Sequence, residues 1–277
     1  MQRVLRSLAD GALFGETWGD GEPVVLALHG WGRTHADFAP SLGPGAPGQG
    51  PPGTPPAALP TVAPDLPGFG ATPPPPRAWG SEDYAEAVAP LLAAIAGGST
   101  PGPGGATAPR PVVVGHSLGG RVAVRLAARH PDLVGALVLT GAPLVPRAAP
   151  RRVPLAFRVV RRLARAGLVG EGRMERARQR HGSADYRAAT GVMRDVLVQM
   201  VNERYEDALS VLCCPVELVW GDDDAEVPLR SAQALAASIP GAHLEICPGA
   251  GHLLPLTAPL ALRAAVVRAA ARAGRHV

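Results

Sequence analysis

Short apolar runs alternate with amphipathic stretches along most of this 277-residue chain, and this alternation restricts the possible folds more than any other feature. Apolar runs of this kind, bounded by Gly, Pro or Asp, are typical of strands. Strands are expected at residues 3–8, 13–18, 24–28, 61–63, 111–114, 135–139, 216–220 and 243–246. Helices are expected at residues 81–96, 118–129, 229–238 and 259–273. This order predicts an α/β fold with a mostly parallel, doubly wound sheet that helices cover on both faces.

The alternation breaks between residues 143 and 210, where only helical periodicity is visible. Residues 192–201 carry one broad apolar face, formed by Val192, Val196, Met200, Met193, Leu197 and Val201. Residues 154–168 predict a second amphipathic helix, with one face formed by Arg158, Arg161, Arg162 and Arg165. We therefore expect a core built from residues 1–142 and 211–277, with a helical cap inserted late in the chain at residues 143–210. Such an insert is typical of a lid.

The composition excludes several classes of protein. With 47% hydrophobic and 18% charged residues, the chain can bury a large core, which excludes a disordered protein. No apolar run approaches the ~18 residues that a membrane span requires. The first residues also lack the apolar segment of about 7 to 15 residues that secretory signals contain. We therefore expect a cytoplasmic protein with no membrane span.

Charge and cysteine content indicate neither nucleic-acid binding nor a metal site. All 27 basic residues are Arg, which indicates a coding bias, so the net charge of +4 says little about partners. Cys213 and Cys214 are neighbours and Cys247 stands alone, so they form neither a disulfide framework nor a zinc motif and are expected to be small buried thiols. No G-x-G-x-x-G follows a strand. We expect no metal, no cofactor and no nucleic-acid partner, and the sequence does not predict an oligomeric state.

The strongest chemical signal is a G-x-S-x-G motif at residues 115–119, between an expected strand and an expected helix. In that context the serine occupies a strained turn that exposes its hydroxyl at the end of the strand, and the glycines permit the close approach of strand and helix. The motif therefore predicts that Ser117 is a nucleophile.

A serine hydroxyl attacks well only when a histidine removes its proton and a carboxylate orients that histidine. His252 lies in a loop just after the last expected strand, which predicts that it is the general base. Residues 222–224 offer three consecutive aspartates after the preceding strand. The chain order Ser, Asp, His is the one that this kind of strand–turn–helix site uses.

The same chemistry needs two amide donors that face the developing oxyanion. The Leu118 amide follows the nucleophile at a helix N-terminus, and the Trp31 amide lies in the glycine-flanked loop after the early buried strand. These two are the expected oxyanion donors. The expected substrate-contacting residues beside them and in the cap are His29, Gly30, His116, Val192, Val196 and Met200.

Taken together, these motifs resemble the α/β-hydrolase fold family, in its small, lid-bearing, serine-nucleophile branch that is similar to carboxylesterases. The motifs that carry the resemblance are HGWG at 29–32, DLPGFG at 65–70, GHSLGG at 115–120, GDDDAEVP at 221–228 and GAGH at 249–252. The resemblance implies that the acid stands three residues after Gly221 and four before Pro228, which is Asp224. Two departures are Thr257, where the family commonly has an acid, and a long Gly/Pro-rich segment after Phe38.

The expected function is hydrolysis of an ester or related acyl bond in a small substrate with an apolar acyl group, through an acyl-enzyme. Dehalogenases and epoxide hydrolases are excluded because their nucleophile is Asp, where this chain has Ser117. The same triad also serves acyltransferases, perhydrolases and C–C bond hydrolases, and the fold includes slow ligand-binding proteins. The sequence does not identify the substrate.

Overall fold

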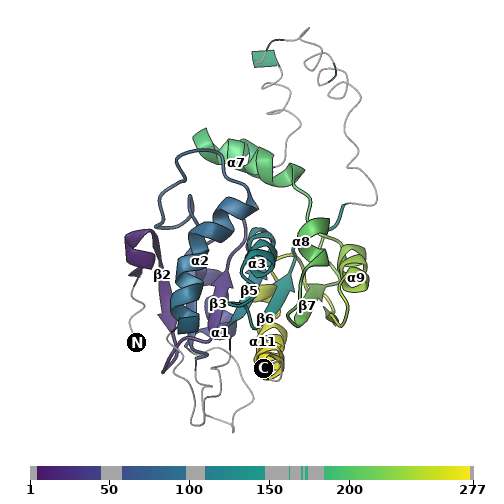
Figure 1. Ribbon diagram of the computed structural model, residues 1–277. Helices are drawn as coiled ribbons and strands as arrows, with labels where there is room; N and C mark the ends of the chain where they lie inside the picture. Colours follow the sequence, from purple (N-terminus) through teal and green to yellow (C-terminus); the bar gives the residue numbers. More distant parts are fainter. Residues whose placement is uncertain are drawn as a thin grey trace. The chain divides into compact units, whose positions relative to one another are not determined.

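The protein is described from a computed structural model that places residues 5–44, 58–97, 110–146 and 184–274, with residues 162, 170, 172 and 173 between the last two ranges. Within these residues one eight-stranded sheet has the order β1-β2-β4-β3-β5-β6-β7-β8. Figure 1 labels β2, β3, β5, β6 and β7 in this order from left to right. The strands are β1 (Arg6–Leu8), β2 (Leu13–Trp18), β3 (Val25–Leu28), β4 (Thr61–Asp65), β5 (Val112–His116), β6 (Ala136–Thr140), β7 (Val216–Gly221) and β8 (His243–Cys247). β2 pairs antiparallel with β1 and β4, and all other neighbours are parallel. The expected mostly parallel sheet is confirmed.

The helices fill the connections between these strands. They are α1 (Ala39–Leu42), α2 (Ser81–Gly97), α3 (Leu118–Arg129), α6 (Ala184–Ala188), α7 (Gly191–Asn202), α8 (Glu206–Ser210), α9 (Leu229–Ser238), α10 (Leu254–Thr257) and α11 (Pro259–Ala273). Two 3₁₀ turns are η1 (Ala9–Gly11) and η2 (His35–Phe38). The sequence does not predict the short helices α1, α6, α8 and α10, because four or five residues are too few to display a helical period.

Helices cover both faces of the sheet. One buried cluster joins alternate strand residues to α1 and α11, and it includes Val25, Ala27, Val112, Val114, Ala136, Val138, Phe38, Leu42, Leu262 and Val266. The strand residues between these, such as Leu26 and Val113, are also buried and point to the other face. α3 packs with α2 and contacts β3, β5 and β6. Crossover connections between parallel strands are right-handed. The connection from β3 to β4 and the connection from β5 to β6 run in opposite directions across the sheet, so α3 lies on the second face.

Most predicted bounds lie within two residues of the observed ones. The strand expected at residues 3–8 is seen as β1 at Arg6–Leu8, and the difference that bears on the site is the end of β4. The sequence predicts a strand that ends at residue 63, because Pro64 has no amide proton for a ladder. In the structure β4 runs on to Asp65, and the last pairs with β2 are Pro64 with Gly15 and Asp65 with Phe14. The extension matters because it places the Asp65 carboxylate at the end of the strand.

The chain divides into two compact units, which are residues 1–74, 81–145 and 204–277, and residues 75–80 and 146–203. The proposed cap boundaries, 143–210, stay a prediction, and α8 belongs to the first unit. In α7 the expected apolar face is partly wrong, because Val201 is 61% exposed while Val196, Leu197 and Met200 are buried. The helix expected at residues 154–168 lies outside the described residues, except for Arg162.

Two further observations concern the surface and the thiols. Among the residues placed by the structure, no helix combines the length and the apolar character that a membrane crossing needs.

Cys247 is buried as expected, but Cys213 is exposed, so the expectation of a buried thiol is wrong there. Burial raises the pKa of the Cys214 thiol to about 11, so this thiol stays protonated at neutral pH.

Candidate active site

The residues singled out in the sequence follow four parallel strands at their carboxyl ends. The loop with Trp31 follows β3, Ser117 follows β5, Asp224 follows β7, and His252 follows β8. Because β3, β5, β6, β7 and β8 are parallel neighbours, their carboxyl ends lie along the same edge of the sheet. Ligands and reacting groups in open α/β sheets gather at this edge.

Ser117 occupies the strained turn that the motif predicts. Its backbone has φ 51° and ψ −108°, a conformation that is uncommon for a residue other than glycine. The turn is held because the Ser117 amide donates to the Thr140 carbonyl oxygen at 2.9 Å. The helix that follows approaches β3 so closely that a Cβ on Gly119 would lie 1.9 Å from the Leu28 carbonyl oxygen. These contacts hold a half-buried serine between β5 and α3.

Asp224 and His252 form a hydrogen-bonded pair. His252 Nδ1 lies 2.9 Å from Asp224 Oδ2, and the Asp224 side chain is 2% exposed. The other oxygen, Asp224 Oδ1, accepts from the amides of Glu226 at 2.9 Å and Val227 at 2.8 Å. Because a carboxylate oxygen accepts hydrogen bonds, the contact places the His252 proton on Nδ1, and Nε2 is the nitrogen that can accept a proton. The exposed Glu226 carboxylate lies 3.5 Å from that Nε2.

The neighbouring aspartates point elsewhere. Asp222 and Asp223 are both exposed. Asp222 Oδ1 accepts from the Gly249 amide at 2.7 Å, which ties the turn after β7 to the loop after β8. Asp224 is thus the member of the aspartate run that touches the histidine.

The two amides expected to bind an oxyanion lie beside Ser117. Leu118 is the first residue of α3, so its amide has no partner within the helix. Trp31 lies in a turn that is closed by a hydrogen bond of 3.3 Å from the Arg33 amide to the Gly30 carbonyl oxygen. Gly32 in this turn has φ +66°, and a positive φ at this position is what a type II turn requires. A Cβ on Gly30 would be 3.3 Å from Ser117 Cβ, so this turn begins next to the nucleophile.

His29 and His116, expected beside the substrate, are 0% and 1% exposed. Burial lowers the pKa of each to about 4, and nearby His252 lowers that of His116 further, so both rings are neutral at neutral pH. His116 Nε2 lies 2.9 Å from the His252 carbonyl oxygen and donates to it. This placement favours a positioning role for both histidines over direct contact with a substrate.

The other expected substrate contacts are apolar residues of α7. Val196 and Met200 are buried and Val192 is half-buried. They belong to the second compact unit, so their part in a substrate site stays a prediction.

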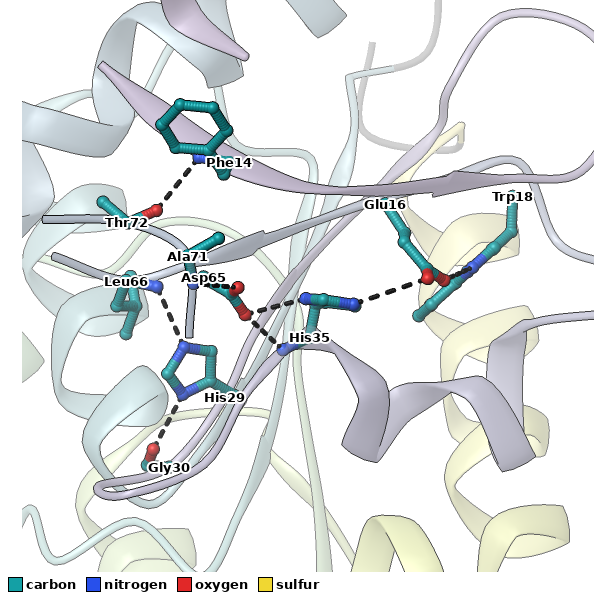
Figure 2. A network of polar contacts seen from close by, with 10 residues as sticks. All are labelled: Phe14, Glu16, Trp18, His29, Gly30, His35, Asp65, Leu66, Ala71 and Thr72. Atoms are coloured by element: carbon teal, nitrogen blue, oxygen red, sulfur yellow. Dashed lines mark hydrogen bonds and ion pairs between the residues drawn. The ribbon is translucent and has the colours of Figure 1, made fainter. Parts of the chain in front are cut away.

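A buried polar network that the sequence did not predict supports the loops after β3 and β4 (Figure 2). Asp65 accepts hydrogen bonds from the His35 amide at 2.9 Å, from His35 Nδ1 at 2.7 Å and from the Ala71 amide at 2.9 Å. His35 Nε2 lies 3.5 Å from Glu16 Oε1, and Trp18 Nε1 donates to the other Glu16 oxygen at 2.8 Å. The signal that could have found it is the aspartate of the DLPGFG motif, which follows a strand.

This network predicts a pH dependence of stability. The hydrogen bond to Asp65 raises the pKa of His35 above its usual 6.5. The folded protein therefore binds this proton more tightly than the unfolded chain, and the stabilisation is complete below a pH of about 6.5 and is lost as the pH rises through the raised pKa. We expect the free energy of unfolding to fall more steeply above this pH in the wild type than in His35→Gln, as measured by urea titration. Equal slopes for the two proteins would contradict this role of His35.

A second prediction concerns Gly30, where a Cβ would lie 2.8 Å from His116 Nδ1. Since His116 is itself bonded to the His252 backbone, the Gly30→Ala variant must displace either the turn with Trp31 or the histidine. We expect kcat to fall on the order of 10²-fold, the effect of a displacement of about 1 Å at a reacting centre. Gly97→Ala is the control, because a side chain there meets no other described atom. Ester hydrolysis by Gly30→Ala at the rate of this control would show that the turn tolerates the shift.

Among the placed residues, no cluster of three or more His, Cys, Asp or Glu side chains has a geometry that fits a metal ion.

Comparisons with known proteins agree with the fold and the motifs. The profile of the alpha/beta hydrolase family matches residues 24–265. The chain is 32% identical to the pimeloyl-[acyl-carrier protein] methyl ester esterase of Aromatoleum aromaticum over 269 residues, which cover 86% of this chain and 94% of the relative. It is 36% identical to an esterase of Mycobacterium tuberculosis over 136 residues, or 47% of this chain and 36% of that protein. An esterase structure from Thermogutta terrifontis has the same fold, with a TM-score of 0.62 and 24% identity over 97% of both chains.

Proposed function

Because the chain belongs to the alpha/beta hydrolase family, we propose that it is a serine hydrolase that cleaves an ester bond of a small substrate through an acyl-enzyme. The observation that carries the proposal is the 2.9 Å contact between His252 Nδ1 and Asp224 Oδ2, at the sheet edge where Ser117 occupies its strained turn. A histidine with one nitrogen held by a buried carboxylate has its other nitrogen oriented for proton transfer.

The proposed reaction begins when Ser117 Oγ attacks the carbonyl carbon of the ester and its proton passes to His252 Nε2. Asp224 stays ionised and stabilises the imidazolium that forms. The tetrahedral intermediate then collapses, the alcohol leaves with the proton from Nε2, and Ser117 carries the acyl group. Water then attacks the acyl carbonyl carbon from the place that the alcohol left, and its proton passes to His252 Nε2. The second tetrahedral intermediate collapses, the bond to Ser117 Oγ breaks, and Nε2 returns the proton to Oγ, which releases the carboxylic acid and the free serine.

The negative charge of each tetrahedral intermediate requires donors that are in place before the reaction. The amides of Leu118 and Trp31 meet this requirement, since one opens α3 directly after the nucleophile and the other lies in the turn beside it. In a serine protease, removal of one such hydrogen-bond donor lowers kcat by on the order of 10²-fold to 10³-fold.

Relatives support the ester class of substrate. Two proteins that this chain resembles are named as esterases, and one of them acts on a methyl ester of an acyl chain held by a carrier protein. An acyltransferase, a perhydrolase or a C–C bond hydrolase would use the same triad, and a ligand-binding protein would keep it with slow turnover.

Fluorophosphonate labelling followed by an ester series tests the proposal. The probe should form one adduct, which mass spectrometry places on Ser117. Nitrophenyl esters of increasing acyl length should then give steady turnover at a rate that depends on the acyl chain. Labelling without turnover of any ester would favour the ligand-binding alternative, and turnover only when an acceptor alcohol is added would favour the acyltransferase.

A further inference from the structure

His29 makes two hydrogen bonds that fix the position of its proton. Its Nε2 lies 2.9 Å from the Leu66 amide nitrogen, and because an amide can only donate, Nε2 must accept. Its Nδ1 lies 2.7 Å from the Gly30 carbonyl oxygen, and because a carbonyl can only accept, Nδ1 must donate. Both contacts require the neutral ring with its proton on Nδ1, which agrees with a pKa lowered to about 4 by burial. Figure 2 shows the ring between these two partners.

The hydrogen bond from His29 Nδ1 to the Gly30 oxygen also determines the direction of the Trp31 N–H, because both groups belong to one peptide bond. The Gly30 carbonyl and the Trp31 amide belong to the same peptide group, and no described peptide bond is cis. In a planar trans peptide the C=O and N–H bonds point in opposite directions. A donor that holds the Gly30 oxygen on one side therefore directs the Trp31 N–H to the other side.

The surroundings of His29 make this contact rigid. The ring is 0% exposed, and its edge meets Phe69, with 5.5 Å between the ring centroids. Phe69 also packs at 5.0 Å against the Trp31 ring, so one aromatic side chain touches both the histidine and the turn. The Gly30 oxygen accepts a further, longer hydrogen bond of 3.3 Å from the Arg33 amide. His29 thus provides the shorter of the two contacts that orient this peptide.

From these contacts we infer that His29 is a positioning residue, whose Nδ1–H holds the Gly30 carbonyl so that the Trp31 amide faces the oxyanion formed on Ser117. The inference rests on the proposed function, because it assumes an oxyanion at that place. It assigns to the histidine of the HGWG segment a task separate from substrate contact, and it explains why the ring must stay neutral and hold its proton on one nitrogen.

Two substitutions separate the two contacts of the ring. The polar atoms of Asn are bonded to Cγ, as His Nδ1 is, so His29→Asn keeps a donor for the Gly30 oxygen and loses the acceptor for Leu66. The polar atoms of Gln lie one bond further out, near the place of Nε2, so His29→Gln keeps the acceptor for Leu66 and loses the donor for Gly30. The two variants are close in size and polarity, which makes each a control for the other.

The expected result is a selective loss in His29→Gln. Its kcat for nitrophenyl ester hydrolysis should fall on the order of 10-fold to 10²-fold, with KM unchanged, since a misdirected oxyanion donor weakens the transition state and not the ground state. A trifluoromethyl ketone, which forms a tetrahedral oxyanion on the serine, should bind more weakly by the same factor. His29→Asn should keep most of its kcat. A loss in His29→Asn as large as that in His29→Gln, or wild-type kcat in His29→Gln, would overturn the inference.

A measurement on the unmodified protein keeps the test valid if the variants do not fold. The ¹⁵N shifts of the His29 ring should show a protonated Nδ1 and an unprotonated Nε2, and the Trp31 amide proton should move downfield when the trifluoromethyl ketone binds. A proton on Nε2, or a Trp31 amide that does not respond, would contradict the inference.

These outcomes are distinct from a failure of the proposed function. If wild-type protein neither hydrolyses any ester nor reacts with the fluorophosphonate, the proposed function is wrong. If the wild type is active and loses activity in Ser117→Ala, but His29→Gln retains its kcat, the function stands and the inference about His29 is wrong.

Discussion

Replacing Ser117 by alanine should lower ester hydrolysis by on the order of 10³-fold or more. The hydroxyl is the proposed attacking group, so without it no acyl-enzyme should form, and only oxyanion binding and substrate positioning can assist attack by water. Fluorophosphonate labelling should disappear in the same variant. The measurement is kcat/KM for a nitrophenyl ester on protein freed of contaminating esterases, because a trace of another hydrolase would hide the loss.

The fold of this variant should survive, because alanine keeps the Cβ and the backbone bond from the residue 117 amide to the Thr140 carbonyl. Ser210→Ala is the matched control, since Ser210 is exposed and its hydroxyl donates to the Asp207 carbonyl one turn earlier in α8. We expect this control to hydrolyse esters at the wild-type rate. If Ser117→Ala has a wild-type unfolding curve and still hydrolyses the ester at a substantial rate, another residue is the nucleophile.

The positions of the candidate nucleophile and the candidate base were predictable because their signals are local. A strand, a G-x-S-x-G and a helix occupy consecutive positions, and this order alone predicts a strained turn like the one seen at Ser117. His252 was found by the same reasoning, as a histidine in a loop after the last strand of a parallel sheet. Such predictions need only the order of elements, since a parallel sheet brings all of its carboxyl ends to one edge.

The candidate acid was harder to predict, because three adjacent aspartates are equivalent in local composition. Only the family spacing singled out Asp224. The structure supplies the physical difference, since Asp224 is buried and accepts two amide hydrogen bonds while Asp222 and Asp223 are exposed. Burial of this kind depends on how the turn after β7 packs against the loop after β8, which no pattern within residues 221–228 contains.

The long-range contacts of the supporting residues were missed for a related reason. His35 reaches Asp65 across 30 positions of sequence, and His29 reaches Leu66 across 37. Periodicity and motifs report neighbours along the chain, and they say nothing about which distant polar groups meet inside a core. The sequence could not show whether Val192, Val196 and Met200 contact a substrate, because an amphipathic helix has an apolar face wherever it packs.

Replacing Asp224 by asparagine should cost the most activity of any change in the aspartate run. Asn keeps an oxygen that can accept from the Glu226 and Val227 amides, so its amide group is turned toward His252 Nδ1. An N–H group facing Nδ1 forces the histidine into the tautomer with its proton on Nε2, where it can no longer accept the serine proton. The same change of Asp to Asn in the triad of a serine protease lowers kcat by about 10⁴, and we expect a loss that approaches this size.

Asp222→Asn and Asp223→Asn are the matched controls for this expectation. Both positions are exposed, and an asparagine at residue 222 can still accept from the Gly249 amide through its side-chain oxygen. We expect each control to stay within a few fold of wild-type kcat, because neither side chain contacts the imidazole. Equal losses at all three positions would contradict the assignment of Asp224.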